Sequence, residues 1–92
     1  MYRNKKLRES ARDESCVNCG AMDGTVVYAH SNELRHGKGK GIKCHDVFGA
    51  YLCHRCHHEY DQGTKLTREQ KRTLFREWWE ETLIRACEKE NI

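Results

Sequence analysis

The most regular hydrophobic pattern in this sequence lies towards its end, where apolar side chains recur at the three- and four-residue spacing of a helix. Thr67 and Gln70 fit a capping box, in which each side chain satisfies a free N–H group at the start of a helix. The pattern predicts a helix over about residues 67–89 with its apolar stripe in the core, and base stacking by the two tryptophans is the functional alternative. The stripe consists of Leu74, Phe75, Trp78, Trp79, Leu83 and Ala86.

Shorter hydrophobic patterns predict two elements in the first third of the chain. Residues 3–14 are mostly polar, with Leu7 and Ala11 four positions apart, and predict a short basic helix. Residues 25–29 are rich in β-branched and aromatic side chains, which are typical of strands. We expect this strand to belong to a β-hairpin over about residues 15–30.

The middle of the chain contains a basic, glycine-rich segment followed by an apolar run. Residues 31–45 alternate glycine with lysine and predict a flexible basic loop. The apolar run 48–52 then leads into a segment expected to be helical from Cys53 to Asp61 and to end at Gly63. Strands and helices in this order predict a small α+β fold.

Composition raises the question of what stabilises so small a fold. The chain has 92 residues, enough for one domain, and only 37% of them are hydrophobic. It also carries six cysteines and six histidines, and small domains with a thin core usually depend on disulfides or a bound metal. No run approaches the ~18 apolar residues of a membrane span. The basic N-terminus has no apolar stretch after it, so we expect a cytoplasmic protein rather than a secreted one.

Basic side chains concentrate in the first half of the chain. The first 45 residues hold nine basic and five acidic side chains, whereas the remainder hold eight and nine. Such a basic half is typical of proteins with a polyanionic partner, most simply a nucleic acid. The alternative is that the net charge of +3 serves solubility alone.

Two Cys-x-x-Cys pairs carry the strongest chemical signal. Paired thiolates at this spacing can face one tetrahedral ion, and two pairs together complete a Cys₄ zinc site. Two disulfides, as in a stapled secreted protein, are the alternative, and a reducing compartment favours metal. Of the other cysteines, Cys87 lies on the apolar stripe and is expected to be a buried thiol, and Cys44 could compete as a ligand. The paired cysteines are Cys16, Cys19, Cys53 and Cys56.

Three further side chains could form a reactive site. On the expected helix, His57 and Asp61 are four residues apart and share a face, where they could chelate a divalent ion or form a surface ion pair. His30 ends the expected strand next to the basic loop and could act as a general base, or it could be an ordinary histidine at the edge of the core.

Together these motifs resemble the HNH endonucleases of the ββα-metal (His-Me finger) type, most closely a group of small phage and prophage nucleases. The resemblance covers roughly residues 7–63 and implies one domain over residues 1–92, with its core at about 14–63. It implies Cys₄ zinc knuckles, flanked by an N-terminal basic helix and a C-terminal amphipathic helix. The matching motifs are Leu7-Arg8-x-x-Ala11-Arg12, Cys-x-x-Cys, Ala29-His30, the loop from Gly39 to Lys43, Asp46, and the segment from Cys53 to Asp61.

The resemblance also implies a role for each matching residue. His30 would be the general base that takes a proton from the attacking water, and His57 would bind a catalytic Mg²⁺ or Mn²⁺. That ion would bind a scissile phosphate oxygen and stabilise the leaving 3′ oxygen. The four cysteines would hold a separate structural zinc. Candidate phosphate contacts are Lys40, Lys43 and Arg55.

This chain departs from the HNH pattern at two positions. Many HNH enzymes place a metal-binding Asp directly before the base, where this chain has Ala29; the ligand is then expected to be Asp61, with Asp46 as second choice. The Asn that orients the base is not plainly present, since Asn32 lies too near His30 in sequence. Asp46 could take that catalytic role.

The resemblance therefore implies a metal-dependent endonuclease that hydrolyses phosphodiester bonds of DNA. A non-catalytic zinc-knuckle module that binds nucleic acid is the alternative, because it needs only the four cysteines and the basic half. The resemblance further implies the cytoplasm of a bacterial host if the chain is phage-encoded, and proteins of phage recombination or DNA packaging as further partners. A homodimer is one route to cutting both strands.

Overall fold

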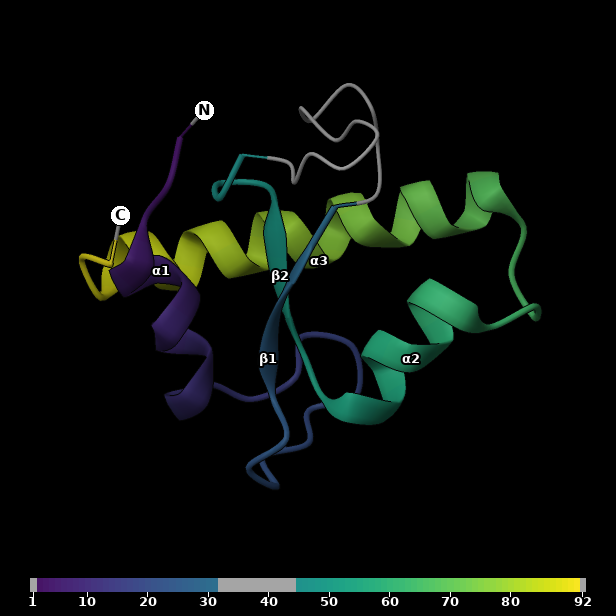
Figure 1. Ribbon diagram of the computed structural model, residues 1–92, viewed down its shortest axis with the longest axis horizontal. Helices are drawn as coiled ribbons and strands as arrows, with labels where there is room; N and C mark the ends of the chain where they lie inside the picture. Colours follow the sequence, from purple (N-terminus) through teal and green to yellow (C-terminus); the bar gives the residue numbers. More distant parts are fainter. Residues whose placement is uncertain (1, 32–44, 92) are drawn as a thin grey trace.

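The computed structural model describes residues 2–31 and 45–91, which form a small α+β fold built on a two-stranded sheet (Figure 1). The long helix α3 crosses this sheet, with α1 near the C-terminal end of α3 and α2 near its N-terminal half (Figure 1). The coarse fold class expected from the sequence is therefore confirmed. The elements are α1 (Lys5–Glu9), the 3₁₀ turn η1 (Ser10–Asp13), β1 (Val27–His30), β2 (Gly49–Leu52), α2 (His54–Gln62) and α3 (Arg68–Glu88).

Strands β1 and β2 pair antiparallel, with Val27 opposite Leu52 at one end and His30 opposite Gly49 at the other. All four residues of β2 are buried, which explains its unbroken apolar sequence. The expected hairpin over residues 15–30 is wrong, because the partner of β1 is β2 and no strand lies within residues 14–26.

Residues 16–21 form a tight turn instead of a strand. The N–H of Gly20 donates to the carbonyl of Cys16 at 2.9 Å, and the N–H of Cys16 donates to the carbonyl of Ala21 at 2.9 Å. Gly20 has φ +80°, a conformation that favours glycine and closes the turn. The turn attaches to the outer edge of β2 because the N–H of Val17 donates to the carbonyl of Tyr51 at 2.8 Å.

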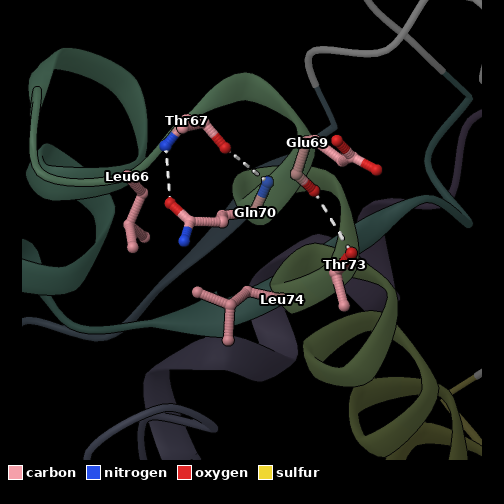
Figure 2. A pocket seen from close by; sticks show the side chains of 6 residues that line it. All are labelled: Leu66, Thr67, Glu69, Gln70, Thr73 and Leu74. Atoms are coloured by element: carbon pink, nitrogen blue, oxygen red, sulfur yellow. Dashed lines mark hydrogen bonds between the residues drawn. The ribbon is translucent and has the colours of Figure 1, made fainter.

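Helix α3 begins with the expected capping box (Figure 2). The Thr67 hydroxyl accepts from the Gln70 N–H at 3.1 Å, and the Gln70 side-chain oxygen accepts from the Thr67 N–H at 2.8 Å. The buried face runs through Phe75, Trp78, Thr82 and Ala86, while Leu74 and Trp79 are partly buried.

The expected burial of Cys87 is wrong, since this thiol is exposed. Residues in a helix are separated by about 100°, and at this end of α3 the buried face is carried by Thr82 and Ala86. Cys87 therefore lies to one side of the face that contacts the core.

Both tryptophans contribute to packing, as the hydrophobic pattern predicts. The Trp78 ring contacts Tyr60 of α2 at a centroid distance of 5.9 Å, and Tyr60 also stacks on Phe75 at 5.2 Å. Trp79 lies against Phe48 at 5.4 Å and donates its indole N–H to the carbonyl of Val47 at 2.7 Å. These contacts hold α2 and the entry to β2 against α3.

A buried hydroxyl adds a hydrogen bond to the packing of α3 on the sheet. The side chain of Thr82 is fully buried, and its Oγ1 accepts a hydrogen bond from the Tyr51 N–H at 3.1 Å. Since β1 lies on the other side of β2, this N–H would otherwise face the apolar surface of α3 without a partner.

Thr82→Val should therefore destabilise the fold although it preserves the shape of the side chain. Leaving the buried N–H of Tyr51 unpaired is expected to lower the free energy of unfolding by about 1–3 kcal/mol, measured by denaturant titration. The matched control is Thr73→Val, an exposed position on the same helix, which should change stability by less than about 0.5 kcal/mol. Equal effects of the two substitutions would show that the Thr82 bond is unimportant.

Candidate metal centre and active site

Four cysteine sulfurs meet where the turn at residues 16–21 lies against the junction of β2 and α2. The sulfurs of Cys16, Cys19, Cys53 and Cys56 all lie within 4.8 Å of one another, and those of Cys19 and Cys53 are 3.6 Å apart. Four thiolates at ~2.3 Å around a tetrahedral ion would be ~3.8 Å apart. The cluster is thus close enough to bind a metal such as zinc, and none of the five described cysteines forms a disulfide.

The thiols of this cluster differ in their pKa. Burial raises the pKa of the Cys16 thiol, but hydrogen bonds from the backbone N–H groups of Cys19, Cys53 and Asn18 and from the Cys19 side chain together outweigh burial and bring this pKa down to about 7. Burial raises the pKa of Cys56 to about 12, although the Asn18 amide donates to its sulfur at 3.3 Å. Metal binding must therefore displace protons, most of all from Cys56.

Arg55, expected from the sequence to contact phosphate, lies beside this cluster. A hydrogen bond to the Cys19 sulfur raises the pKa of the Arg55 guanidinium, and the nearby sulfurs act in the same direction. The other expected phosphate contacts, Lys40 and Lys43, lie outside the described residues, as do Asn32 and Cys44.

His30, the expected base, is the last residue of β1, and its ring is hydrogen-bonded to the side chain of Asp46. The His30 Nε2 atom lies 2.9 Å from Asp46 Oδ1, and the ring also meets Tyr28 edge-on at a centroid distance of 5.5 Å. An ionised carboxylate can only accept hydrogen bonds, so Nε2 carries a proton, and in the neutral imidazole Nδ1 then keeps its lone pair. The histidine side chain is 25% exposed, which leaves room for a water or a ligand.

Asp46 is a buried charge with many donors. Its side chain is fully buried, and besides His30 it accepts hydrogen bonds from the Arg3 guanidinium at 2.9 Å and the Asn4 N–H at 2.6 Å. It also forms an ion pair with the Arg8 guanidinium, whose Nε lies 3.0 Å from Oδ2. Burial raises the pKa of this carboxyl, but the hydrogen bonds from Asn4, His30 and Arg3 and the charge of Arg8 together hold it below its ordinary value. Asp46 is therefore ionised at neutral pH.

Sequence reasoning missed the N-terminal partners of Asp46. Arg3, Asn4 and Arg8 lie about forty positions before it in the sequence, and no local pattern predicts a contact over that separation. The only hint was the basic character of residues 3–14.

His57 and Asp61 share a face of α2, as their spacing predicts. Their Nε2 and Oδ2 atoms are 3.0 Å apart, and each side chain is 35% exposed. This geometry suits either a surface ion pair or two ligands of one cation, so both interpretations remain compatible with the structure.

The two histidine–carboxylate pairs lie on different elements. His30 lies at the Gly49 end of the strand pair, whereas α2 starts just beyond Leu52, at the opposite end. From there α2 turns back along the side of the sheet (Figure 1). Within residues 2–31 and 45–91, the four cysteines are the only group of three or more cysteine, histidine or acidic side chains close enough to share a metal.

Comparison with known proteins identifies no relative. The chain matches no protein-family model and shows no significant similarity to a curated protein or to a solved structure. Among the described residues, no helix has the length and apolar character needed to cross a membrane. Any proposal of function therefore has to rest on the chemistry of the cysteine cluster and of the two histidine–carboxylate pairs.

The cysteine cluster predicts that bound metal and stability are linked. Cys19→Ser removes an exposed ligand and should lower both the metal bound per chain and the melting temperature, because metal binding contributes folding free energy. The measurements are metal analysis and thermal unfolding with and without a chelator. Cys87→Ser, the matched control at an exposed thiol outside the cluster, should match the parent, and a loss of metal in this control alone would contradict the assignment.

Asp46→Asn should destabilise the chain by about 1–3 kcal/mol at pH 7, because it replaces the charged acceptor of the Arg3, Asn4 and His30 hydrogen bonds with a neutral amide. Since the pKa of Asp46 is lowered by folding, its stabilisation is complete above the unfolded value of 3.8 and is lost as pH falls through the folded value. The stability difference between parent and variant should therefore shrink below about pH 4. Metal loss in acid affects both proteins, so the difference between their denaturation curves is the diagnostic quantity.

Asp13→Asn is the matched control, because Asp13 is an exposed carboxylate in the neighbouring 3₁₀ turn. It should behave like the parent at every pH. A difference between Asp46→Asn and the parent that stays constant from neutral to strongly acidic pH would contradict the charged role of Asp46.

Proposed function

We propose that this chain is a metal-dependent DNA endonuclease of the HNH type. The observation that carries the proposal is the bond between His30 and the buried Asp46, at the end of the first strand of a strand–strand–helix unit. An imidazole that is held in place at the end of a strand, with one unprotonated ring nitrogen, is suited to activate water. The antiparallel strands, the directly following helix and the cysteine cluster are in the order that the family resemblance implies.

His30 would act through its Nδ1 atom. With Nε2–H held by Asp46, Nδ1 accepts a proton from water as the water attacks phosphorus, and the imidazolium formed is stabilised by the same carboxylate. Asp46 thus takes the orienting role. It is a poor candidate for a metal ligand, because its side chain is fully buried and both of its oxygens already accept from cationic or N–H donors.

His57 and Asp61 are suited to hold the catalytic cation. Two ligand atoms each ~2.1 Å from an octahedral ion, at a right angle, would lie ~3.0 Å apart, and their actual separation is 3.0 Å. Both side chains are partly exposed, so water and a phosphate oxygen could complete the coordination. A Mg²⁺ or Mn²⁺ ion here would supply charge neutralisation at the scissile phosphate and the leaving 3′ oxygen.

The four cysteines would hold a structural zinc ion. Cys16 and Cys19 come from the turn that attaches to β2, and Cys53 and Cys56 come from the start of α2. One ion on both pairs would tie the turn to the strand–helix junction and so set where α2 starts. Sulfur ligands favour zinc, whereas the imidazole and carboxylate of α2 favour Mg²⁺ or Mn²⁺.

The proposal predicts nicking of supercoiled plasmid DNA when Mg²⁺ or Mn²⁺ is added. His30→Ala should reduce the rate by at least about 100-fold, because it removes the general base, while keeping the bound zinc. His57→Ala should also lower the rate, and added metal should partly restore it. Plasmid nicking by gel electrophoresis and metal analysis give the two readouts.

The matched control is His58→Ala, an exposed histidine next to His57 on α2, which should nick like the parent. If His30→Ala cuts as fast as the parent, the assignment of the base is wrong. If the parent binds DNA and never cuts it with either metal, the chain is a non-catalytic zinc-knuckle module.

A further inference from the structure

Two side chains other than cysteines donate hydrogen bonds to sulfurs of the cysteine cluster. The Nδ2 atom of Asn18 lies 3.3 Å from the sulfur of Cys56 and donates to it. The Arg55 guanidinium is hydrogen-bonded to the sulfur of Cys19. Cys56 is buried and Cys19 is exposed, so the two donors reach the cluster on its inner and its outer side.

The two contacts cross between the cysteine pairs. Asn18 directly precedes Cys19 in the first pair, and its amide donates to a cysteine of the second pair. Arg55 directly precedes Cys56 in the second pair, and its guanidinium donates to a cysteine of the first pair. Each pair thus supplies a donor to the last sulfur of the other pair. Both contacts add to the link between the turn at residues 16–21 and the start of α2.

The two donors suit thiolate ligands by different means. Four thiolates carry more negative charge than a divalent ion neutralises, so nearby cations and N–H donors stabilise such a centre. Arg55 supplies a full positive charge, which also interacts with the sulfurs of Cys53 and Cys56. Asn18 supplies a neutral, directional N–H, and a hydrogen bond to a charged acceptor is stronger than one between neutral groups.

We propose that Asn18 and Arg55 are positioning residues of the metal centre, which orient Cys56 and Cys19 through crossed hydrogen bonds and so raise the affinity for zinc. The proposal rests on the metal proposed for the four cysteines and is independent of nuclease activity. It gives Arg55 a role at the metal in place of the phosphate contact that the HNH resemblance implies. Groups that hold a metal ligand in place by a hydrogen bond typically contribute about 10–100-fold to metal affinity.

The test is the zinc affinity of the reduced full chain, measured by competition with a chromogenic chelator. Asn18→Leu keeps the approximate size of this exposed side chain but removes its N–H donors, and should weaken zinc binding about 10–100-fold. The matched control is His54→Leu, at an exposed position within the second cysteine pair, which should bind zinc like the parent. Equal affinities of Asn18→Leu and the parent would overturn the proposal.

Arg55→Gln should also weaken zinc binding, because it removes both the charge and the donor beside Cys19. The matched control is Lys65→Gln, which removes the same charge from a residue that lines the same surface hollow as Arg55 and Cys19. If Lys65→Gln loses as much affinity as Arg55→Gln, general charge accounts for the effect and the role of Arg55 is wrong.

The absorption of the Co²⁺-loaded protein reports on the sulfurs themselves. A hydrogen bond lowers the energy of the thiolate lone pairs, so its loss should shift the sulfur-to-cobalt charge-transfer band of Asn18→Leu to longer wavelength. His54→Leu should leave the band in place, and an unshifted band in Asn18→Leu contradicts the proposal. A parent chain that binds neither ion contradicts the metal assignment and this proposal with it. A parent chain that binds zinc and never nicks DNA contradicts only the nuclease proposal.

Discussion

The buried carboxylate of Asp46 is the interaction on which the rest of this structure depends. An unpaired charge in the interior would cost several kcal/mol, and here the cost is offset by three hydrogen-bond donors and by an ion pair with Arg8. Two of these partners are arginines and one is the backbone N–H of Asn4, so the charge helps to anchor the N-terminal segment, together with the buried Leu7 and Ala11. The fourth partner is His30, whose Nε2 atom meets the same carboxylate.

The strand pair is held at its two ends by different chemistry. At the His30 end, Asp46 joins β1 to the N-terminal segment through charged hydrogen bonds. At the other end, the four cysteines join the turn at residues 16–21 to the start of α2. Between these ends, the fully buried β2 lies against α3, and the Thr82 hydroxyl accepts a hydrogen bond from the Tyr51 N–H of this strand. The two short strands and the thin core are thus supplemented by charged hydrogen bonds at one end of the sheet and, at the other end, by a cysteine cluster that could bind a metal.

Local patterns in the sequence were enough to predict the helices. Capping chemistry and helical spacing act within a few residues, so α3 begins at its expected capping box and buries Phe75 and Trp78. The cysteine cluster could also be predicted, because each Cys-x-x-Cys turn is local and two such pairs are typical of a metal site. The pairing of His57 with Asp61 followed from one helical turn.

Contacts between residues far apart in the sequence could not be predicted from it. The partner of β1 lies some twenty residues away rather than in an adjacent hairpin, because residues 16–21 turn to bring two cysteines together. Arg3 and Arg8 reach Asp46 across about forty positions, and a count of charges shows only that the first half is basic. Thr82 illustrates the same limit, since a polar residue on a hydrophobic face is predicted only by knowing which backbone N–H it meets.

The most direct test of this account is the tautomer of His30, measured by ¹⁵N NMR of histidine-labelled protein at neutral pH. The signal is assigned by its absence in His30→Ala. A protonated Nε2 and an unprotonated Nδ1, changed by Asp46→Asn, are expected if Asp46 orients the imidazole and leaves Nδ1 to accept the proton of water. A protonated Nδ1 in the parent protein would contradict the account, because the nitrogen assigned as the base would then have no lone pair to offer.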